Sequence, residues 1–317
     1  MPAPPAIRVE HLAKSYGAFT AVHDVSFEVG VGEVFCLLGP NGAGKTTTTE
    51  ILEGYRRRDS GSVDVLGHDP GDGERTLRER IGIVLQECGL QGDLTVREVL
   101  DMYGWYYPCR LPTDAVIELV ELDAKATDRV GHLSGGQRRR LDVGLALVGD
   151  PDLIFLDEPT TGFDPAARRN SWATFRRLSE LGKTVLLTTH FMDEAEALAD
   201  RIAVVVSGRI VSEGTPETLG GRDRAPATIT ATLPVNVSAS DLPDLAGVAV
   251  PIGTDAAVGP TLTDGRLEIV TTDDVMVLNR LTGWALERSL PLNDLAVSRP
   301  SLEDIYLTLT DQQEALR

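Results

Sequence analysis

The sequence predicts an α/β fold whose core is a doubly wound parallel sheet. Runs of strand length with apolar cores lie at 34–39, 81–85, 153–157, 184–190 and 202–206. Stretches with a helical pattern separate them, at 44–53, 95–107, 114–121, 136–148, 166–181 and 192–199. Strands that are apolar at every position are buried on both faces, as in a parallel sheet covered by helices. The alternation of strand and helix therefore indicates an α/β core.

The N-terminal region follows a different pattern. Residues 6–30 contain short runs that alternate apolar and polar side chains, and 61–67 has the same character. This alternation is typical of strands with one exposed face, so we expect an antiparallel sheet at the edge of the core.

The composition changes after Gly220–Gly221, where we place a domain boundary. Residues 222–265 are rich in Pro, Ala, Thr and Gly, with weak strand patterns in ATITATL and GVAVPI. A strand pattern, RLEIVTT, and a helical one, DDVMVLNRLTGWAL, follow before the terminal SLEDIYLTLTDQQ. We expect one domain over 1–221, with a helical insert at about 87–140, and a small α+β accessory domain over 222–317.

Composition excludes several classes of protein. The net charge of −18 over 317 residues argues against a nucleic-acid partner, because proteins that hold phosphate backbones concentrate Lys and Arg. No apolar run approaches the ~18–20 residues of a membrane span, and MPAPPAIRVE lacks the apolar part of a secretory signal. We therefore expect a cytosolic chain. Cys36, Cys88 and Cys109 have no CxxC spacing, so we expect neither a disulfide framework nor a zinc site.

A phosphate-binding loop follows the apolar run at 34–39. The pattern GxxxxGK[ST] is matched by Gly39, Pro40, Asn41, Gly42, Ala43, Gly44, Lys45 and Thr46. Glycines let backbone N–H groups approach phosphate oxygens, and the helix that follows adds positive partial charge at its start. Lys45 is expected to reach the β- and γ-phosphates and Thr46 to ligate Mg²⁺, with the next residue, Thr47, also at the nucleotide.

Two acidic residues, Asp157 and Glu158, end another buried strand, LIFLDE. In enzymes with this loop, an Asp after an apolar strand holds Mg²⁺ directly or through water. Glu158 is the better candidate for polarising the attacking water, because it lies at the carboxyl end of the sheet. The loop at 39–46 could also be an ordinary glycine-rich turn, and Asp157-Glu158 could be a polar strand exit before a turn. The presence of both motifs in one chain strengthens the functional interpretation of each.

A second glycine cluster is formed by Ser134, Gly135, Gly136 and Gln137, at the start of the helix RRRLDVGLALV. A hydroxyl, exposed amides and the helix dipole make this an anion site, although Ser134 also suits a plain helix cap. One chain cannot easily place two such loops on one γ-phosphate. Two chains packed head to tail can, each covering the nucleotide of the other.

Together, the loop at 39–46, LSGGQ at 133–137 and LIFLDE at 153–158 resemble the ATP-binding subunits of ABC transporters. The resemblance implies further roles for individual residues. Gln86 matches the glutamine that contacts Mg²⁺ and senses the γ-phosphate, and His190 matches the switch histidine. Asp164 matches the aspartate of the D-loop, where Phe163 stands in place of the usual Leu, and Tyr16 matches the aromatic that stacks on adenine.

The resemblance also implies a function and partners. It implies an ATPase that uses ATP and Mg²⁺, dimerises on binding ATP, and energises a separately encoded transmembrane permease from the cytoplasmic side of the membrane. The terminal RPSLEDIYLTLT resembles the accessory domain of daunorubicin-resistance and multidrug exporters, which implies export of a drug or other hydrophobic compound.

The sequence also leaves open alternatives from other classes of protein. An ABC ATPase that acts on ribosomes or DNA would usually carry two cassettes or basic surfaces, whereas this chain has one loop of this kind and is acidic. A kinase or GTPase would lack LSGGQ and the switch histidine. A non-catalytic interaction module remains open for residues 222–317.

Overall fold

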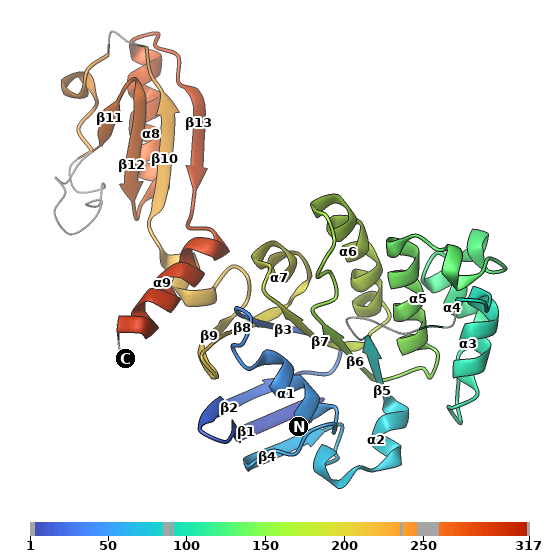
Figure 1. The fold of residues 1–317 in the computed structure, drawn as a ribbon. Helices are drawn as coiled ribbons and strands as arrows, with labels where there is room; N and C mark the ends of the chain where they lie inside the picture. The colour runs from blue at the N-terminus through green and yellow to red at the C-terminus, as the bar shows by residue number, and fades with distance from the viewer. Residues whose placement is uncertain (1–3, 85–89, 91, 235–236, 246–259, 316–317) are drawn as a thin grey trace. The chain divides into compact units, whose positions relative to one another are not determined.

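The computed structural model describes residues 4–84, 90, 92–234, 237–245 and 260–315, with side chains described as far as residue 310. The chain divides into two compact units, Met1–Pro216 with Leu309–Arg317, and Glu217–Thr308. Each unit is described by itself (Figure 1).

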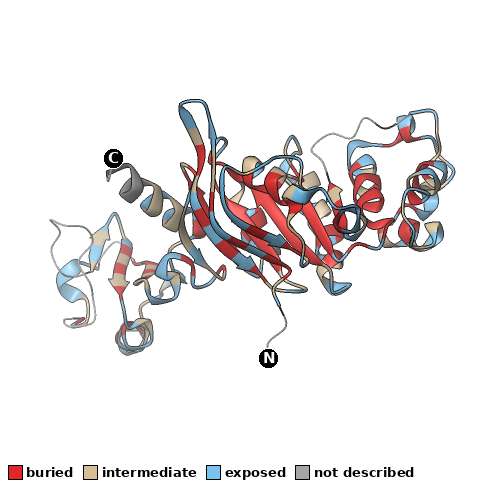
Figure 2. Ribbon diagram, turned by 90° about the horizontal axis from the view of Figure 1, so that it is seen from below, coloured by how far each residue is buried: buried red, intermediate tan, exposed pale blue. Residues whose placement is uncertain are grey.

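The first unit is built on a large sheet with the strand order β5-β6-β7-β3-β8-β9. The strands are β3 (Val34–Leu38), β5 (Ile81–Val84), β6 (Leu153–Asp157), β7 (Thr184–Thr189), β8 (Arg201–Val206) and β9 (Arg209–Gly214). From β5 to β8, neighbours in this order are parallel. Every residue of β3 and β7 is buried, and Figure 2 shows buried strands across the sheet. The predicted parallel core is confirmed.

The edge strand β9 departs from the all-parallel expectation, because it pairs antiparallel with β8. Ser207 and Gly208 connect the two strands with φ angles of 50° and 76°. Positive φ at both central residues matches the twist of a tight hairpin. The residues of β9 are exposed or half-buried, so no strictly apolar run marks this strand in the sequence.

A smaller antiparallel sheet, ordered β2-β1-β4, confirms the expectation for the N-terminal region. It contains β1 (Ile7–Tyr16), β2 (Phe19–Val29) and β4 (Ser60–Val65). Its apolar face shares one core with the large sheet and α1 (Lys45–Leu52). The rings of Phe27 and Phe35 stack between the sheets, with centroids 5.2 Å apart and planes 6° apart.

Helices complete the first unit. The bounds are α2 (Arg75–Arg80), α3 (Val96–Gly104), α4 (Thr113–Leu119), α5 (Gly135–Leu147), α6 (Pro165–Glu180) and α7 (Met192–Leu198). α5 packs against β5, α6 against β7, and α7 against β3 and β7. α3 and α4 lie beside α5 and form the helical insert. A capping box begins α3, since Thr95 and Glu98 each accept a hydrogen bond from the other's backbone N–H.

The second unit is a small antiparallel sheet, ordered β11-β12-β10-β13, with a helix on one face. Its elements are β10 (Ala227–Thr232), β11 (Thr261–Thr263), β12 (Arg266–Thr271), α8 (Asp274–Glu287) and β13 (Asn293–Ser298). Alternate residues of β10 and β12 pack against Val277, Leu281 and Trp284 of α8. α9 (Leu302–Ala315) follows. The strand expected at GVAVPI lies outside the described residues.

Candidate functional site

The strand order brings three candidate segments together. β7 lies between β3 and β6, and the three strands are parallel. The loops that follow them therefore leave the same edge of the sheet side by side. They carry Lys45 after β3, Glu158 after β6 and His190 after β7.

The loop after β3 requires glycine at two positions where other backbone comes close. A Cβ on Gly39 would lie 2.2 Å from the carbonyl oxygen of Val205, and one on Gly44 would lie 2.4 Å from that of Ala21. Gly44 also has a φ of 102°, in the left-handed region. It caps α1 without a side-chain acceptor, so this helix start keeps N–H groups for a ligand.

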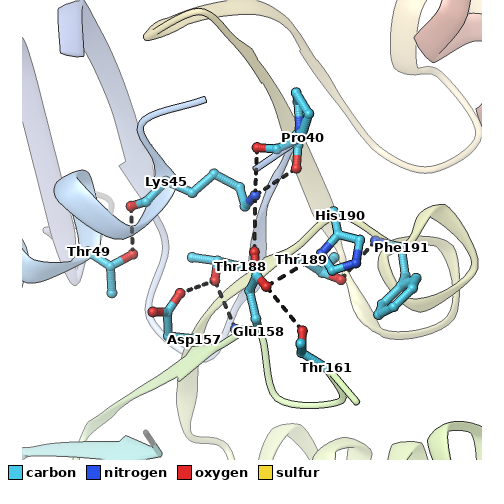
Figure 3. A network of polar contacts seen from close by, with 11 residues as sticks. Pro40, Lys45, Thr49, Asp157, Glu158, Thr161, Thr188, Thr189, His190 and Phe191 are labelled. Carbon is cyan, nitrogen blue, oxygen red and sulfur yellow. Dashed lines mark hydrogen bonds and ion pairs between the residues drawn. The ribbon is translucent and has the colours of Figure 1, made fainter. Parts of the chain in front are cut away.

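Lys45 is buried at the bottom of this loop, with 4% of its surface exposed. Its Nζ donates to the carbonyl oxygens of Gly39 at 2.7 Å and Pro40 at 3.1 Å. The same atom lies 3.3 Å from Oε1 of Glu158 (Figure 3). The ammonium group is thus held in place by the loop itself and by the carboxylate at the end of β6.

A pocket of about 450 Å³ opens above Lys45. Its lining comes from the phosphate loop, the first hairpin and the end of β6: Tyr16, Phe19, Ala21, Asn41, Gly42, Gly44, Lys45, Thr46, Thr47, Asp157 and Glu158. The pocket combines aromatic side chains with a lysine and a helix start. This combination suits a base and a polyphosphate, respectively.

Asp157 faces Thr188 across the sheet, since these two residues pair in register between β6 and β7. The Thr188 hydroxyl donates to Oδ1 of Asp157 and accepts from the backbone N–H of Glu158 at 3.0 Å. Burial raises the pKa of Asp157, and the neighbouring Glu158 charge adds to this, while the Thr188 hydrogen bond opposes it. The charged form of Asp157 is therefore disfavoured unless a cation compensates its charge.

Glu158 adopts a left-handed backbone conformation with a φ of 43°, which is uncommon for a residue with a side chain. Its Oε2 accepts from the Thr161 hydroxyl at 3.0 Å. Burial acts to raise the pKa of this carboxyl, but Lys45, the Thr161 hydroxyl and His190 together bring it below its ordinary value. Glu158 is therefore an anion at neutral pH.

His190 completes the cluster. Its Nδ1 lies 3.4 Å from Oε2 of Glu158, yet makes no hydrogen bond to the residues that the structure describes. Figure 3 shows Lys45 and His190 approaching Glu158 from two sides. One carboxylate is thus placed between a lysine and an imidazole.

The donor set fits Mg²⁺ held jointly with a nucleotide. The Thr46 hydroxyl and the Asp157 carboxylate line the same pocket. In the described part of the chain no group of three or more His, Cys, Asp or Glu side chains could hold a metal by itself. Mg²⁺ characteristically takes one or two protein oxygens and completes its shell with phosphates and water. Two oxygen donors beside a phosphate loop match that requirement.

The second glycine cluster lies away from this pocket. Ser134 caps α5: its Oγ accepts from Gln137 N–H at 3.3 Å, and Gln137 Oε1 accepts from Ser134 N–H at 3.0 Å. Ser134, Gly136 and Gln137 line a separate hollow of about 390 Å³ between α5 and α6. The fold of one chain therefore does not bring them to Lys45.

Of the three remaining predicted residues, one lines the Lys45 pocket, one caps a helix and one lies outside the described residues. Tyr16 lines the Lys45 pocket, with the Lys14 and Arg56 side chains 5.6 and 5.5 Å from its ring centre. Asp164 caps α6, accepting from Ala166 and Ala167 N–H groups at 2.9 Å. Gln86 lies outside the described residues.

Thr188 and Thr161 are site residues that the motifs do not single out. Thr188 bonds to both acidic positions, and Thr161 holds Glu158. The signal available in the sequence is the Thr-Thr pair before His190, because hydroxyl residues at the end of an otherwise apolar strand need polar partners.

Comparison with known proteins gives this arrangement a family. Residues 22–161 match the family described as ABC transporter. Residues 227–301 match the family described as ABC transporter domain-containing protein-like, C-terminal domain.

Two relatives illustrate the sequence similarity. The chain is 47% identical over 219 residues to Nod factor export ATP-binding protein I of Paraburkholderia xenovorans, covering 68% of this chain and 72% of that protein. It is 46% identical over 224 residues to the protein of that name in Rhizobium johnstonii, covering 68% and 71%.

Solved structures agree with this. An ATP-binding cassette of an ABC transporter in its ADP conformation is 26% identical with a TM-score of 0.60, covering 68% of this chain and 92% of the cassette. The cbiO1 protein of Clostridium perfringens, part of the ABC transporter complex cbiONQ, is 27% identical with a TM-score of 0.62, covering 68% and 90%. The predicted fold class is confirmed. The chain belongs to the ATP-binding proteins of ABC transporters and is an ATP hydrolase.

Proposed function

We propose that this ATPase energises an exporter whose transmembrane permease is encoded separately. The observation that carries the catalytic part is the position of Glu158, with Lys45 Nζ at 3.3 Å and His190 Nδ1 at 3.4 Å, at the mouth of a phosphate loop. The relatives' name, Nod factor export ATP-binding protein I, supports export as the direction of transport.

Each side chain has a role that follows from its position. Lys45 and the N–H groups at the start of α1 bind the phosphates, while Tyr16 packs against the base. Glu158, an anion held by Thr161, orients and deprotonates the attacking water. His190 stabilises negative charge on the γ-phosphate, which is an electrostatic effect.

Thr46 and Asp157 are the proposed Mg²⁺ ligands within the described residues, with Gln86 added by the resemblance. When bound, Mg²⁺ would neutralise phosphate charge. Thr188 holds Asp157 in place by its hydroxyl. Its second hydrogen bond, from Glu158 N–H, keeps the two acidic residues in a fixed relation.

We infer that two copies of the chain share the catalytic work, as a homodimer formed on ATP binding. Ser134, Gly135 and Gly136 are exposed, and a Cβ on either glycine would meet open space. A helix start that is open to solvent and separate from the chain's own Lys45 pocket is suited to the nucleotide of a second copy. Asp164, exposed at the start of α6, is the proposed D-loop contact in the same interface.

Exposed aromatic side chains support docking on a permease. Trp105 is 77% exposed, Tyr106 71% and Tyr55 69%, and exposed apolar surface is the kind that a protein partner covers. The helices in the described part of the chain include none with the length and hydropathy to cross a membrane. The cbiO1 protein of similar fold is part of a transporter complex. We propose that the chain acts at the cytoplasmic side of the membrane and reaches it through the permease.

The proposed cargo is a drug or another hydrophobic compound. The terminal RPSLEDIYLTLT, which resembles the multidrug exporters' accessory domain, supports this class. Nod factor, which is part of the relatives' name, is the other cargo to test.

Reconstitution tests the proposal. The chain and a candidate permease, co-purified and placed in vesicles, should accumulate cargo only with ATP and should fail with Glu158→Gln. Trp105→Ala with Tyr106→Ala should abolish co-purification and leave ATP binding unchanged. Val31→Ala, at another exposed apolar position, is the matched control. Hydrolysis that responds to ribosomes or nucleic acid and not to any permease would overturn the proposal.

A further inference from the structure

Three side chains in contact, His190, Phe191 and Arg168, form a column beside Glu158. The ring of Phe191 lies 4.0 Å from the imidazole of His190, centroid to centroid, with the two planes at 41°. On Phe191 lies the guanidinium of Arg168, whose Cζ is 4.0 Å from the ring centroid. Figure 3 shows the His190–Phe191 pair beside Glu158. Arg168 stands in the first turns of α6, four residues after the D-loop aspartate, Asp164.

Two contacts hold the Arg168 guanidinium, one with the Phe191 ring and one with Asp193. Its NH2 donates to Oδ2 of Asp193, in the first turn of α7, at 3.0 Å. Its side chain is 13% exposed. Its Nε is buried and makes no hydrogen bond to any residue in the described ranges. The guanidinium thus combines a bond to Asp193 with a contact on the Phe191 ring, and the compact ammonium of a lysine does not reproduce this pair of contacts in the same geometry.

The orientation of His190 depends on this column. Its Nδ1 makes no hydrogen bond among the described residues and is 3.4 Å from Glu158. The ring is therefore oriented by packing against Phe191 and by the charge of Glu158. Phe191 in turn is held by its backbone N–H, which donates to Thr189 Oγ1 at 3.0 Å, and by Arg168 above its ring.

A second contact links the same three segments. Glu194 of α7 is fully buried, and its Oε1 accepts from the Thr160 hydroxyl at 2.8 Å. Thr160 follows Glu158 by two residues, so α7 is tied both to the segment after β6 and, through Asp193, to the start of α6. Because these contacts connect the three segments, we expect a shift of the α6 start to move His190 as well.

We propose that Arg168 is a positioning residue that sets the orientation of the His190 imidazole through Phe191, and so couples catalysis to the D-loop end of α6. This inference rests on the proposed role of His190. Arg168 does not line the Lys45 pocket. It acts by keeping one imidazole orientation populated.

The test compares Arg168→Lys, which keeps the charge and removes the guanidinium, with Phe191→Leu. Arg169→Gln, at the adjacent and exposed position of α6, is the matched control. We expect kcat to fall on the order of 10-fold in the first two variants, since a small misplacement of a catalytic group is costly. ATP affinity should stay within about 2-fold, because neither residue lines the Lys45 pocket. Melting temperatures should stay close to that of the parent chain.

A double-mutant comparison separates positioning from general stabilisation. In a His190→Ala background, measured by single turnover, Arg168→Lys should cause no further loss, because the group through which it acts is gone. An equal loss in both backgrounds, or unchanged kcat in Arg168→Lys and Phe191→Leu, would overturn the proposal.

Histidine NMR supplies a readout independent of activity. The chain has five histidines, so His190 ring signals can be assigned by comparison with His190→Ala. Arg168→Lys, which leaves the Phe191 ring in place, should shift these signals, and Arg169→Gln should leave them unchanged. If His190→Ala hydrolyses ATP normally, the proposed role of His190 fails, and unshifted signals in Arg168→Lys would separately refute the positioning.

Discussion

Lys45 and Glu158 form an ion pair at the end of the parallel sheet, with Nζ 3.3 Å from Oε1 and only 3% and 15% of their side chains exposed. The lysine follows β3 and the glutamate follows β6, so the pair spans β7, which lies between those strands. The fold therefore holds the proposed phosphate-binding charge and the proposed water-activating carboxylate against each other.

Removing the lysine should abolish nucleotide binding. Lys45→Ala deletes the cation at the bottom of the pocket and leaves Glu158 without its nearest positive partner, so bound phosphate would face an uncompensated carboxylate. We expect ATP affinity to fall by at least about 100-fold, measured with a fluorescent nucleotide. Lys183→Ala, which breaks a surface pair with Asp150, is the control. Retained micromolar affinity would remove Lys45 from the binding role.

Neutralising the glutamate should separate binding from turnover. Glu158→Gln keeps the side-chain shape but cannot accept a proton from water, so kcat should fall by about 100-fold or more with ATP still bound. The variant should accumulate as a nucleotide-bound dimer in light scattering, whereas Glu180→Gln, at an exposed position of α6, should behave as the parent chain. A Glu158→Gln protein that stays monomeric with ATP would contradict the shared-site proposal.

Thr188→Val tests the threonine that bonds to both acidic positions. Valine keeps the shape but removes the donor to Asp157 and the acceptor for Glu158 N–H. We expect a loss of stability of about 1–3 kcal/mol and a higher Mg²⁺ requirement for hydrolysis. Thr184→Val removes a hydroxyl near the opposite end of β7, which accepts from Gly32 N–H at 3.0 Å. It should lower stability alone. An equal Mg²⁺ dependence in both variants would show that Thr188 is merely structural.

The stability of the fold should depend on pH through the titration of Glu53. Burial raises the pKa of this carboxyl from 4.5 to about 8, with the Asp157 and Glu50 charges adding to the shift. A raised pKa stabilises the fold while the carboxyl is protonated, so this contribution is complete below pH 4.5 and is lost as the pH rises toward 8.

Glu53→Gln should remove that dependence, because its amide cannot ionise. Between pH 4 and 7 the Glu53 contribution to the free energy of unfolding should fall by about 3 kcal/mol. Urea unfolding of both proteins across this range measures the difference. Parallel stability curves for the two would show that Glu53 is ionised in the folded chain.

Local patterns were sufficient for much of the fold. The runs with apolar cores at 34–39 and 184–190 correspond to β3 and β7, and the phosphate loop lies between β3 and α1. Both features depend on neighbours in the chain: consecutive apolar residues in the strands, and glycines before a helix start. β9 could not be found in this way, because its residues have no apolar run and its position depends on pairing with β8.

The sequence by itself determined the chemistry available to this protein: a phosphate loop ending in Lys45, adjacent carboxylates at 157 and 158, and a strand that ends in His190. Only the tertiary structure decided how these groups meet. The order β6-β7-β3 brings Thr188 to Asp157, 31 residues away, and places Arg168 over Phe191. Strand order results from burying whole apolar faces together, so contacts between distant residues follow from packing of the complete core and not from any local pattern.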